Sequence, residues 1–137
     1  MSKEFLVAAV KDIVTRARSG DTEGSYDGYA ALFSAPEFLD NRPEDQRRAL
    51  ELLILAKRTG PASDKLIEAH RSAIEPLTQL VSAHHEPADL ELLGLCQLVT
   101  GDAVAAAELF RDALTRERAR DAGSTLCGRL MTRVSAL

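Results

Sequence analysis

Apolar side chains recur at every third or fourth position along much of this chain, which is the spacing of one face of an α-helix. The first run covers 3–18 and predicts an amphipathic helix that ends at Gly20-Asp21. A shorter helix is expected over 26–34, with 22–25 as a lengthened turn before it. The apolar positions of the first run are Phe5, Leu6, Ala9, Val10, Ile13, Val14 and Ala17.

A polar connection follows the interruption at Ala35-Pro36. Within it, Asn41 or Asp40 is predicted to cap the next helix, with Pro43 in its first turn. That helix is predicted over 44–58. Its central run Ala49 to Ala56 is apolar except at Glu51, so we expect this helix to pack on more than one side.

Gly60-Pro61 is predicted to end this helix, and Ser63 or Asp64 to cap the following one. Because proline removes a backbone hydrogen bond, Pro76 predicts a kink or a break near Ile74 and Glu75. The residues on one face of this fourth helix are Leu66, Ala69, His70, Ala73, Ile74, Leu77 and Val81.

The stretch 90–114 has the most regular pattern and predicts two helices joined at Gly101-Asp102. Glycine readily takes the left-handed conformation that ends a helix, and an aspartate after it can accept hydrogen bonds from the next helix. Gly94 and Ala106 remove bulk where the two helices approach, and Phe110 is expected to be a large side chain that a neighbouring hairpin must accommodate. Apolar residues at Leu126, Leu130, Val134 and Leu137 then predict a final helix that covers the last apolar face.

This hairpin resembles a tetratricopeptide repeat. The residues that carry the resemblance are Leu93-Gly94, Gly101-Asp102, Ala106, Phe110, Ala113 and Leu114. The chain departs from the family pattern at Leu90, where Trp is usual, and at Arg118, where Pro often closes a repeat. Turn glycines at 20, 60 and 101 recur at about 40 residues, a longer interval than the roughly 34 residues of this repeat.

The resemblance implies an all-α fold: a right-handed α-α superhelix of about three helix hairpins plus a C-terminal capping helix. We expect one domain over 1–137, with units at about 3–40, 43–84 and 87–119 and a cap at 121–137. The composition agrees with helix, because the hydrophobic content is 45% but only 4% of residues are aromatic.

Charge and apolar runs narrow the classes of partner. A net charge of −4, from 17 basic and 21 acidic residues, gives no electrostatic footprint for nucleic acid or an anionic membrane. The apolar run Phe5 to Val10 is too short for a signal-peptide core or a membrane span. Cys96 and Cys127 form no Cys-x-x-Cys motif and are interpreted as small buried residues. A cytoplasmic location follows from these features.

Catalytic chemistry has little support in the sequence. His84-His85-Glu86 is the one cluster that suggests a metal or acid-base site, but adjacent helical residues point about 100° apart. His70 is interpreted as a hydrogen-bonded, partly buried histidine. We therefore expect no catalytic residues, no metal and no cofactor, and keep a histidine-based enzyme or metal-binding bundle as the least favoured hypothesis.

In this repeat family the first helix of each hairpin lines an inner groove, and the resemblance carries that role onto the present chain. The predicted groove is apolar with a basic rim, suited to an amphipathic helix or an extended apolar segment of another protein with acidic residues. The residues expected to bind the partner are Val14, Arg18, Ile54, Lys57, Arg58, Leu95 and Leu98.

The leading hypothesis is therefore a non-enzymatic adaptor or chaperone-like protein-binding module. The alternative is a structural or self-associating scaffold, including a homodimer, whose groove is filled by its own C-terminal helix.

Overall fold

The computed structural model describes residues 2–137, and over that range the protein is all-helical, with no β-strand. This confirms the expected all-α class. The chain divides into two compact units, Met1–Pro76 and Leu77–Leu137. The elements are α1 (Ser2–Arg18), α2 (Thr22–Ser34), a 3-10 helix η1 (Pro36–Asp40), α3 (Pro43–Ile54), α4 (Asp64–His84), α5 (Pro87–Val99), α6 (Ala103–Asp121) and α7 (Thr125–Ser135).

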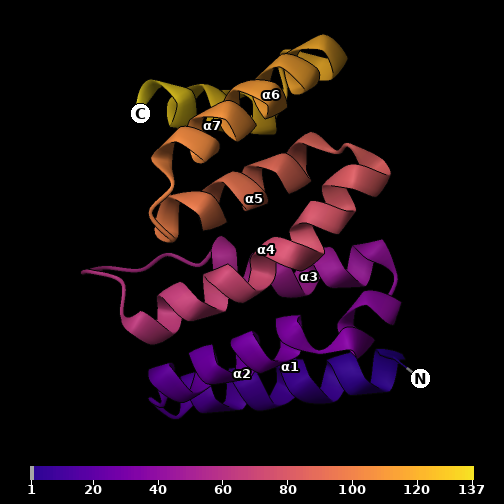
Figure 1. The fold of residues 1–137 in the computed structure, drawn as a ribbon, viewed down its shortest axis with the longest axis vertical. Coiled ribbons are helices and arrows are strands. Elements are labelled where there is room, and N and C mark those ends of the chain that lie inside the picture. The colour runs from indigo at the N-terminus through magenta and orange to yellow at the C-terminus, as the bar shows by residue number, and fades with distance from the viewer. Residues whose placement is uncertain (1) are drawn as a thin grey trace. The chain divides into compact units, whose positions relative to one another are not determined.

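In the first unit, α1 and α2 pack along each other as a hairpin (Figure 1). Gly20 has φ +91°, the left-handed conformation that favours glycine. The Asp21 side chain accepts a hydrogen bond of 2.9 Å from the Gly24 N–H. This cap starts α2 at Thr22, so the prediction that 22–25 form a lengthened turn was wrong.

The start of α3 differs from the prediction in its cap. Pro43 lies in the first turn as expected, but Arg42 occupies the cap position without a side-chain hydrogen bond to the helix. Asn41 instead donates from Nδ2 to the carbonyl oxygens of Glu37 and Phe38, at 3.2 and 3.1 Å. Its side chain therefore closes η1 rather than opening α3.

α3 ends at Ile54, before the predicted end at 58. Arg58 folds back, and its Nη2 donates a 2.6 Å hydrogen bond to the Leu53 carbonyl oxygen. Because α3 ends here, the Leu53 carbonyl has no N–H of a following helical turn as its donor, and Arg58 supplies the hydrogen bond instead. Gly60, with φ +83°, lies in the connection that follows rather than at the helix end.

α4 begins as predicted, because Ser63 Oγ accepts a hydrogen bond of 3.2 Å from the Leu66 N–H. It continues through Pro76, so the break considered there is absent. Pro76 itself is buried, and so are Ala73, three residues before it, and Leu77, directly after it. Burial of apolar groups on both sides offsets the hydrogen bond that proline removes.

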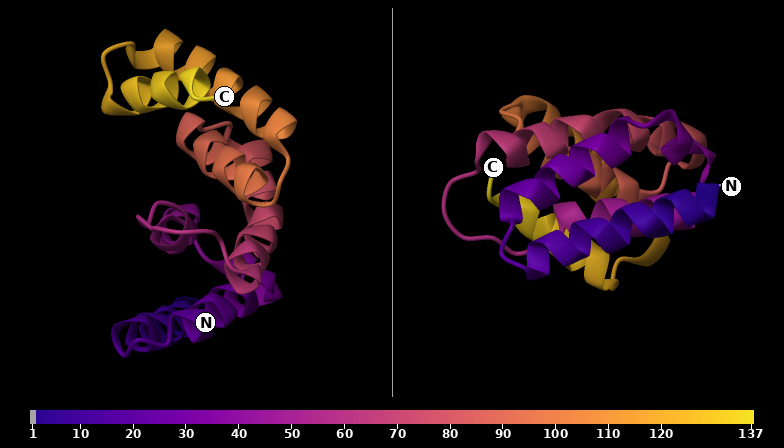
Figure 2. Two further views of the ribbon diagram at one scale, coloured as in Figure 1. Left: turned by 90° about the vertical axis from the view of Figure 1, so that its left-hand side faces the viewer. Right: turned by 90° about the horizontal axis from the view of Figure 1, so that it is seen from below.

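The second unit contains the hairpin of α5 and α6, with α7 packed beside α6 (Figure 2, left). Gly101 has φ +97°, and the Asp102 carboxylate accepts a 3.0 Å hydrogen bond from the Ala105 N–H. This confirms the predicted turn. α7 has a similar cap, because Ser124 Oγ accepts a 2.9 Å bond from the Cys127 N–H.

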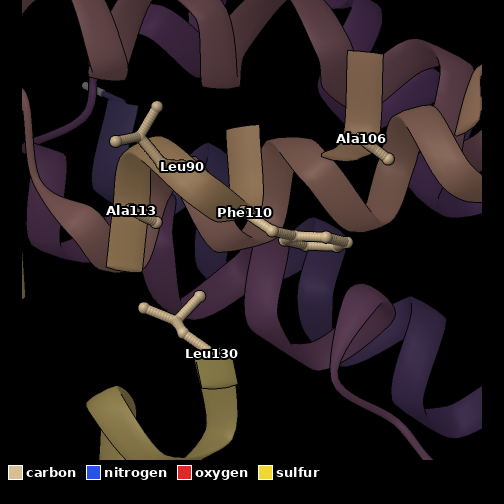
Figure 3. Close-up of a cluster of buried hydrophobic side chains, with 5 residues drawn as sticks. All are labelled: Leu90, Ala106, Phe110, Ala113 and Leu130. Carbon is tan, nitrogen blue, oxygen red and sulfur yellow. The ribbon is translucent and has the colours of Figure 1, made fainter. Parts of the chain in front are cut away.

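A buried cluster joins the three helices α5, α6 and α7. Figure 3 shows Leu130 of α7 extending toward Ala113 of α6 and Leu90 of α5. Leu126 and Val134 pack against the same cluster, whereas Leu137, also expected on this face, is exposed. The cluster residues are Leu90, Ala106, Phe110, Ala113 and Leu130.

Candidate binding groove

A groove lies between two helices of the first unit, α1 and α3. The two helices run in the same direction (Figure 1), and at their N-terminal ends Lys3 Nζ lies 3.6 Å from Asp45 Oδ2. The groove has a volume of about 570 Å³. We call it the α1–α3 groove. Its lining residues are Lys3, Leu6, Val7, Val10, Lys11, Val14, Thr15, Arg18, Asp45, Arg48, Ala49 and Leu52.

The floor of the α1–α3 groove is apolar because α1 carries more apolar surface than its hairpin partner covers. Ile13 is buried, and its side chain lies where a Cβ on Gly28 of α2 would sit. Val10 and Val14 are half-buried, and Val7 is 54% exposed. Leu52 of α3, which is 47% exposed, faces the same groove. An uncovered apolar strip therefore runs along the groove.

The rim of the groove is strongly basic. Lys3, Lys11 and Arg18 come from α1, and Arg48 comes from α3. Within the described part of the lining, Asp45 is the one acidic residue. It is buried, and its Oδ2 also lies 3.4 Å from Arg42 Nε. Four basic residues surround one acidic residue here, although the whole chain has a net charge of −4. The local charge of the groove is thus opposite in sign to that of the protein.

The structure brings together two of the seven residues that the sequence predicted for the groove. Val14 and Arg18 line the α1–α3 groove. Ile54 is buried in the first unit, which leaves little of it for a partner to contact. The groove wall on α3 is formed instead by Arg48, Ala49 and Leu52.

Lys57 and Arg58 lie after α3 and line a different depression, together with Tyr26. Arg58 is held by its own unit: Nε donates to Tyr26 Oη at 3.3 Å, and the guanidinium lies 5.6 Å from the centroid of the Tyr26 ring. Its function in the structure is to fasten the end of α3 to α2.

Leu95 and Leu98 belong to the second unit. Leu95 is half-buried and packs against the cluster around Phe110, while Leu98 is 43% exposed near the end of α5. Neither residue contributes to the lining of the α1–α3 groove.

The residues that sequence reasoning missed are Lys3, Lys11, Arg48 and Leu52. The signal was present on α3, where Asp45, Arg48, Ala49 and Leu52 follow i, i+3, i+4, i+7 and therefore share one face. The leucines at 50, 53 and 55 obscured it, because they give α3 apolar residues on several sides.

The histidines do not assemble a reactive site in the described residues. His70 is buried, and its Nδ1 lies 2.9 Å from the Leu66 carbonyl oxygen. Because a carbonyl can only accept, Nδ1 carries the proton. Burial lowers the pKa of His70, so the ring is held neutral. His84 and His85 are exposed, and no group of three or more metal-ligating side chains occurs within 2–137.

Two buried polar groups of the second unit have structural explanations. Glu91 is 1% exposed and receives hydrogen bonds from Arg129 Nε and Nη2, at 2.7 and 2.8 Å, and from Arg133 Nε at 2.7 Å. Burial raises the pKa of Glu91, but the hydrogen bonds and charges of the two arginines outweigh it, so the pKa lies below its usual value. Burial raises the pKa of Cys96 to about 12, which keeps this thiol protonated.

Comparisons with models of known protein families, with curated proteins and with solved structures gave no match for this chain. Across 2–137, no helix combines the length and the hydropathy that crossing a lipid bilayer requires.

Proposed function

We propose that this protein is a non-enzymatic protein-binding module, an adaptor or chaperone-like protein, that holds a peptide or helix of a partner in the α1–α3 groove. The observation that carries this proposal is the uncovered apolar strip of Val7, Val10, Val14 and Leu52. Exposed apolar side chains that line a concave surface with a polar rim are typical of protein-interaction sites. The cytoplasm is the proposed location, because both cysteines are free and buried.

We also propose that the hairpins are tetratricopeptide-like repeats that form a right-handed superhelix. Two hairpins use the same device, a left-handed glycine followed by an aspartate that caps the next helix, at Gly20-Asp21 and Gly101-Asp102. The contact of Gly94 with Phe110, and the burial of Ala106 and Ala113, support the same assignment.

The competing proposal, a self-associating scaffold whose groove is filled by α7, has weaker support. α7 already uses Leu126, Leu130 and Val134 against the cluster of its own unit. Its charged residues are Arg129 and Arg133, which are of the same sign as the groove rim. An external partner therefore suits the groove better than α7 does.

The test of the proposed function compares two charge insertions at exposed apolar positions. We expect the double variant Val7→Glu/Leu52→Glu to fold, because both side chains are about half exposed, and to lose the partner in cross-linked affinity capture from native cells. Val104→Glu is the matched control, because Val104 is 73% exposed and lies on α6 in the other unit. It should retain the same captured protein. Identical capture by the double variant and the parent chain would remove the groove from the proposal.

A further inference from the structure

The charge pattern of the α1–α3 groove specifies what kind of segment it accepts. We propose that the groove selects an acidic amphipathic helix, with apolar side chains toward the floor and two carboxylates two turns apart on one flank. This inference rests on the proposed function, and it names the chemistry of the partner and the residues that read it.

The charges of the groove rim are complementary to those of an acidic segment. Lys11, Arg18 and Arg48 are all exposed side chains of the rim. Among the described lining residues, Asp45 alone has a carboxylate; it is buried and pairs with Lys3 and Arg42. The end of the groove near Lys3 is thus partly neutralised, whereas the part from Lys11 to Arg18 has no lining carboxylate. Cations around an apolar strip attract carboxylates and repel a basic segment.

The basic residues of α1 have the spacing of one helical flank. Lys11 and Arg18 stand at i and i+7, which places them on one flank about 10.5 Å apart along the helix axis. Val7 and Val14 have the same i, i+7 relation beside them. A partner helix lying along α1 would meet this flank with acidic residues at its own i and i+7 positions. Its apolar residues at i+3 and i+4 spacing would then contact Val7, Val14 and Leu52.

Other occupants fit the α1–α3 groove less well. A second copy that docks groove to groove would place Lys11 and Arg18 opposite the same basic residues. The phosphates of a nucleic acid would pair with the basic residues of the rim, but they would make no favourable contact with the apolar floor of Val7, Val10 and Leu52. An acidic helix of another protein uses both the floor and the rim.

The experiment uses the full chain and three fluorescein-labelled peptides of equal length, each stabilised as a helix by a lactam bridge. All carry the same apolar stripe. One has Glu at i and i+7 on the flank, one has Gln there, and one has the two Glu residues moved to the opposite face. Binding is followed by fluorescence anisotropy at low and high salt.

We expect the flank-Glu peptide to bind roughly 2- to 30-fold more tightly than the other two, because two exposed ion pairs supply this gain. The difference should shrink at high salt. In the variant Lys11→Glu/Arg18→Glu, the preference should reverse toward a fourth peptide with Lys at the flank positions. The matched control Arg111→Glu/Arg118→Glu changes exposed residues of α6 by the same charge and should leave the ranking unchanged.

Equal binding of all three peptides, or no binding of any, would overturn the inference. So would a ranking that ignores the charge reversal at Lys11 and Arg18. Tighter binding of a labelled oligonucleotide would overturn it as well, as would concentration-dependent self-association that Val7→Glu/Leu52→Glu abolishes. If the peptides bind equally but lose binding in Val7→Glu/Leu52→Glu, the acidic preference fails while the proposed groove function stands.

Discussion

The absence of a side chain at Gly94 lets Phe110 lie directly against the backbone of α5. A Cβ built on Gly94 would lie 2.5 Å from Phe110 Cε1 and 2.9 Å from Cδ1, closer than real Cβ atoms approach a neighbour. Phe110 is itself fully enclosed in the cluster of Figure 3, with 1% exposure, so its ring has little room to move away. One methyl group at this position therefore disturbs the packing of the hairpin.

We predict that Gly94→Ala lowers the free energy of unfolding by about 1–3 kcal/mol, the usual effect of overpacking a core. The measurement is urea unfolding followed by circular dichroism. Gly128→Ala in α7 is the matched control, because nothing lies within 4 Å of its added Cβ. There alanine should stabilise the helix by up to about 1 kcal/mol. Equal effects of both substitutions would contradict the packing argument.

The local roles of single residues, such as helix caps and hydrogen-bonded side chains, were the features best predicted from the sequence. Asp102 was predicted to cap the next helix because it follows a glycine and precedes a helical run, and the structure confirms this. Asp21 also caps a helix, although a lengthened turn was expected directly after it. His70 was expected to be hydrogen-bonded and partly buried; the structure confirms the hydrogen bond and shows the residue buried. Arg58 was expected in the groove, but it lies beside Tyr26 in another depression, and the sequence shows no sign of this contact because Tyr26 is 32 residues away.

At the scale of elements, α7 is fastened to α5 by one buried carboxylate. Glu91 is 1% exposed and accepts hydrogen bonds from Arg129 and Arg133, one turn apart on α7. Without its charge, Glu91 would give these arginines a weaker acceptor, and one of the bonds would be lost. The attachment of α7 therefore depends on electrostatics as well as on Leu130.

We predict that Glu91→Gln destabilises the second unit by about 1.5–3 kcal/mol, the usual contribution of a hydrogen bond to a charged group. Relative to the parent chain, the rate of amide hydrogen exchange in the variant should increase in α7. The rate should stay unchanged in α2, which lies in the other unit. Glu108→Gln removes the same charge from an exposed position of α6 and serves as control. Unchanged protection of α7 in Glu91→Gln would show that apolar contacts alone hold this helix.

Helix positions were predicted well where a local signal ended them and poorly where a tertiary contact did. The ends of α1 and α5 follow from glycine, whereas the end of α3 at Ile54 depends on the return of Arg58 to the Leu53 carbonyl. The face of α3 that lines the groove was also missed. Leucines occur on several sides of that helix, so the sequence did not indicate which side is buried. In the structure Leu50 and Leu53 are buried, and Leu52 is exposed.

At the scale of the whole molecule, acid should act on the two units at different pH values. Burial lowers the pKa of His70 in the first unit below its usual value of 6.5. As the pH falls, the His70 ring is therefore protonated in the unfolded chain before it is protonated in the folded chain. The contribution of neutral His70 to stability is fully present above about pH 6.5, and stability falls as the pH drops below that value. Glu91 in the second unit has a pKa below its usual 4.5, so its contribution is present above pH 4.5 and is lost below it.

We predict that the parent chain loses stability between pH 7 and pH 5 by up to about 1.4 kcal/mol per pH unit through His70. His70→Gln should flatten this slope, whatever its effect on stability at pH 8. Urea unfolding of the parent chain and of His70→Gln at pH 8, 6 and 5 measures how the free energy of unfolding of each depends on pH. Identical slopes for parent and variant would mean that His70 does not titrate with unfolding. His84→Gln, at an exposed position, is the control.

The sequence predicted the general character of the groove, an apolar surface with a basic rim, but it did not predict most of the lining residues. An apolar surface with a basic rim was expected from first-helix positions, and Val14 and Arg18 lie in the α1–α3 groove. The remaining predicted residues were chosen by analogy between hairpins, and Leu95 and Leu98 turned out to lie in the other compact unit. Sequence periodicity identifies faces of helices, but it does not say which faces meet.

The contact between Gly94 and Phe110 also bears on how such a chain can diverge. Because the ring of Phe110 occupies the space that a side chain at 94 would need, neither position can change in size alone without strain or a void. The two are energetically coupled, so their substitutions should not be additive. Among relatives of this protein, a residue larger than glycine at 94 is expected to occur together with a smaller one at 110, and the pair should covary as a single unit.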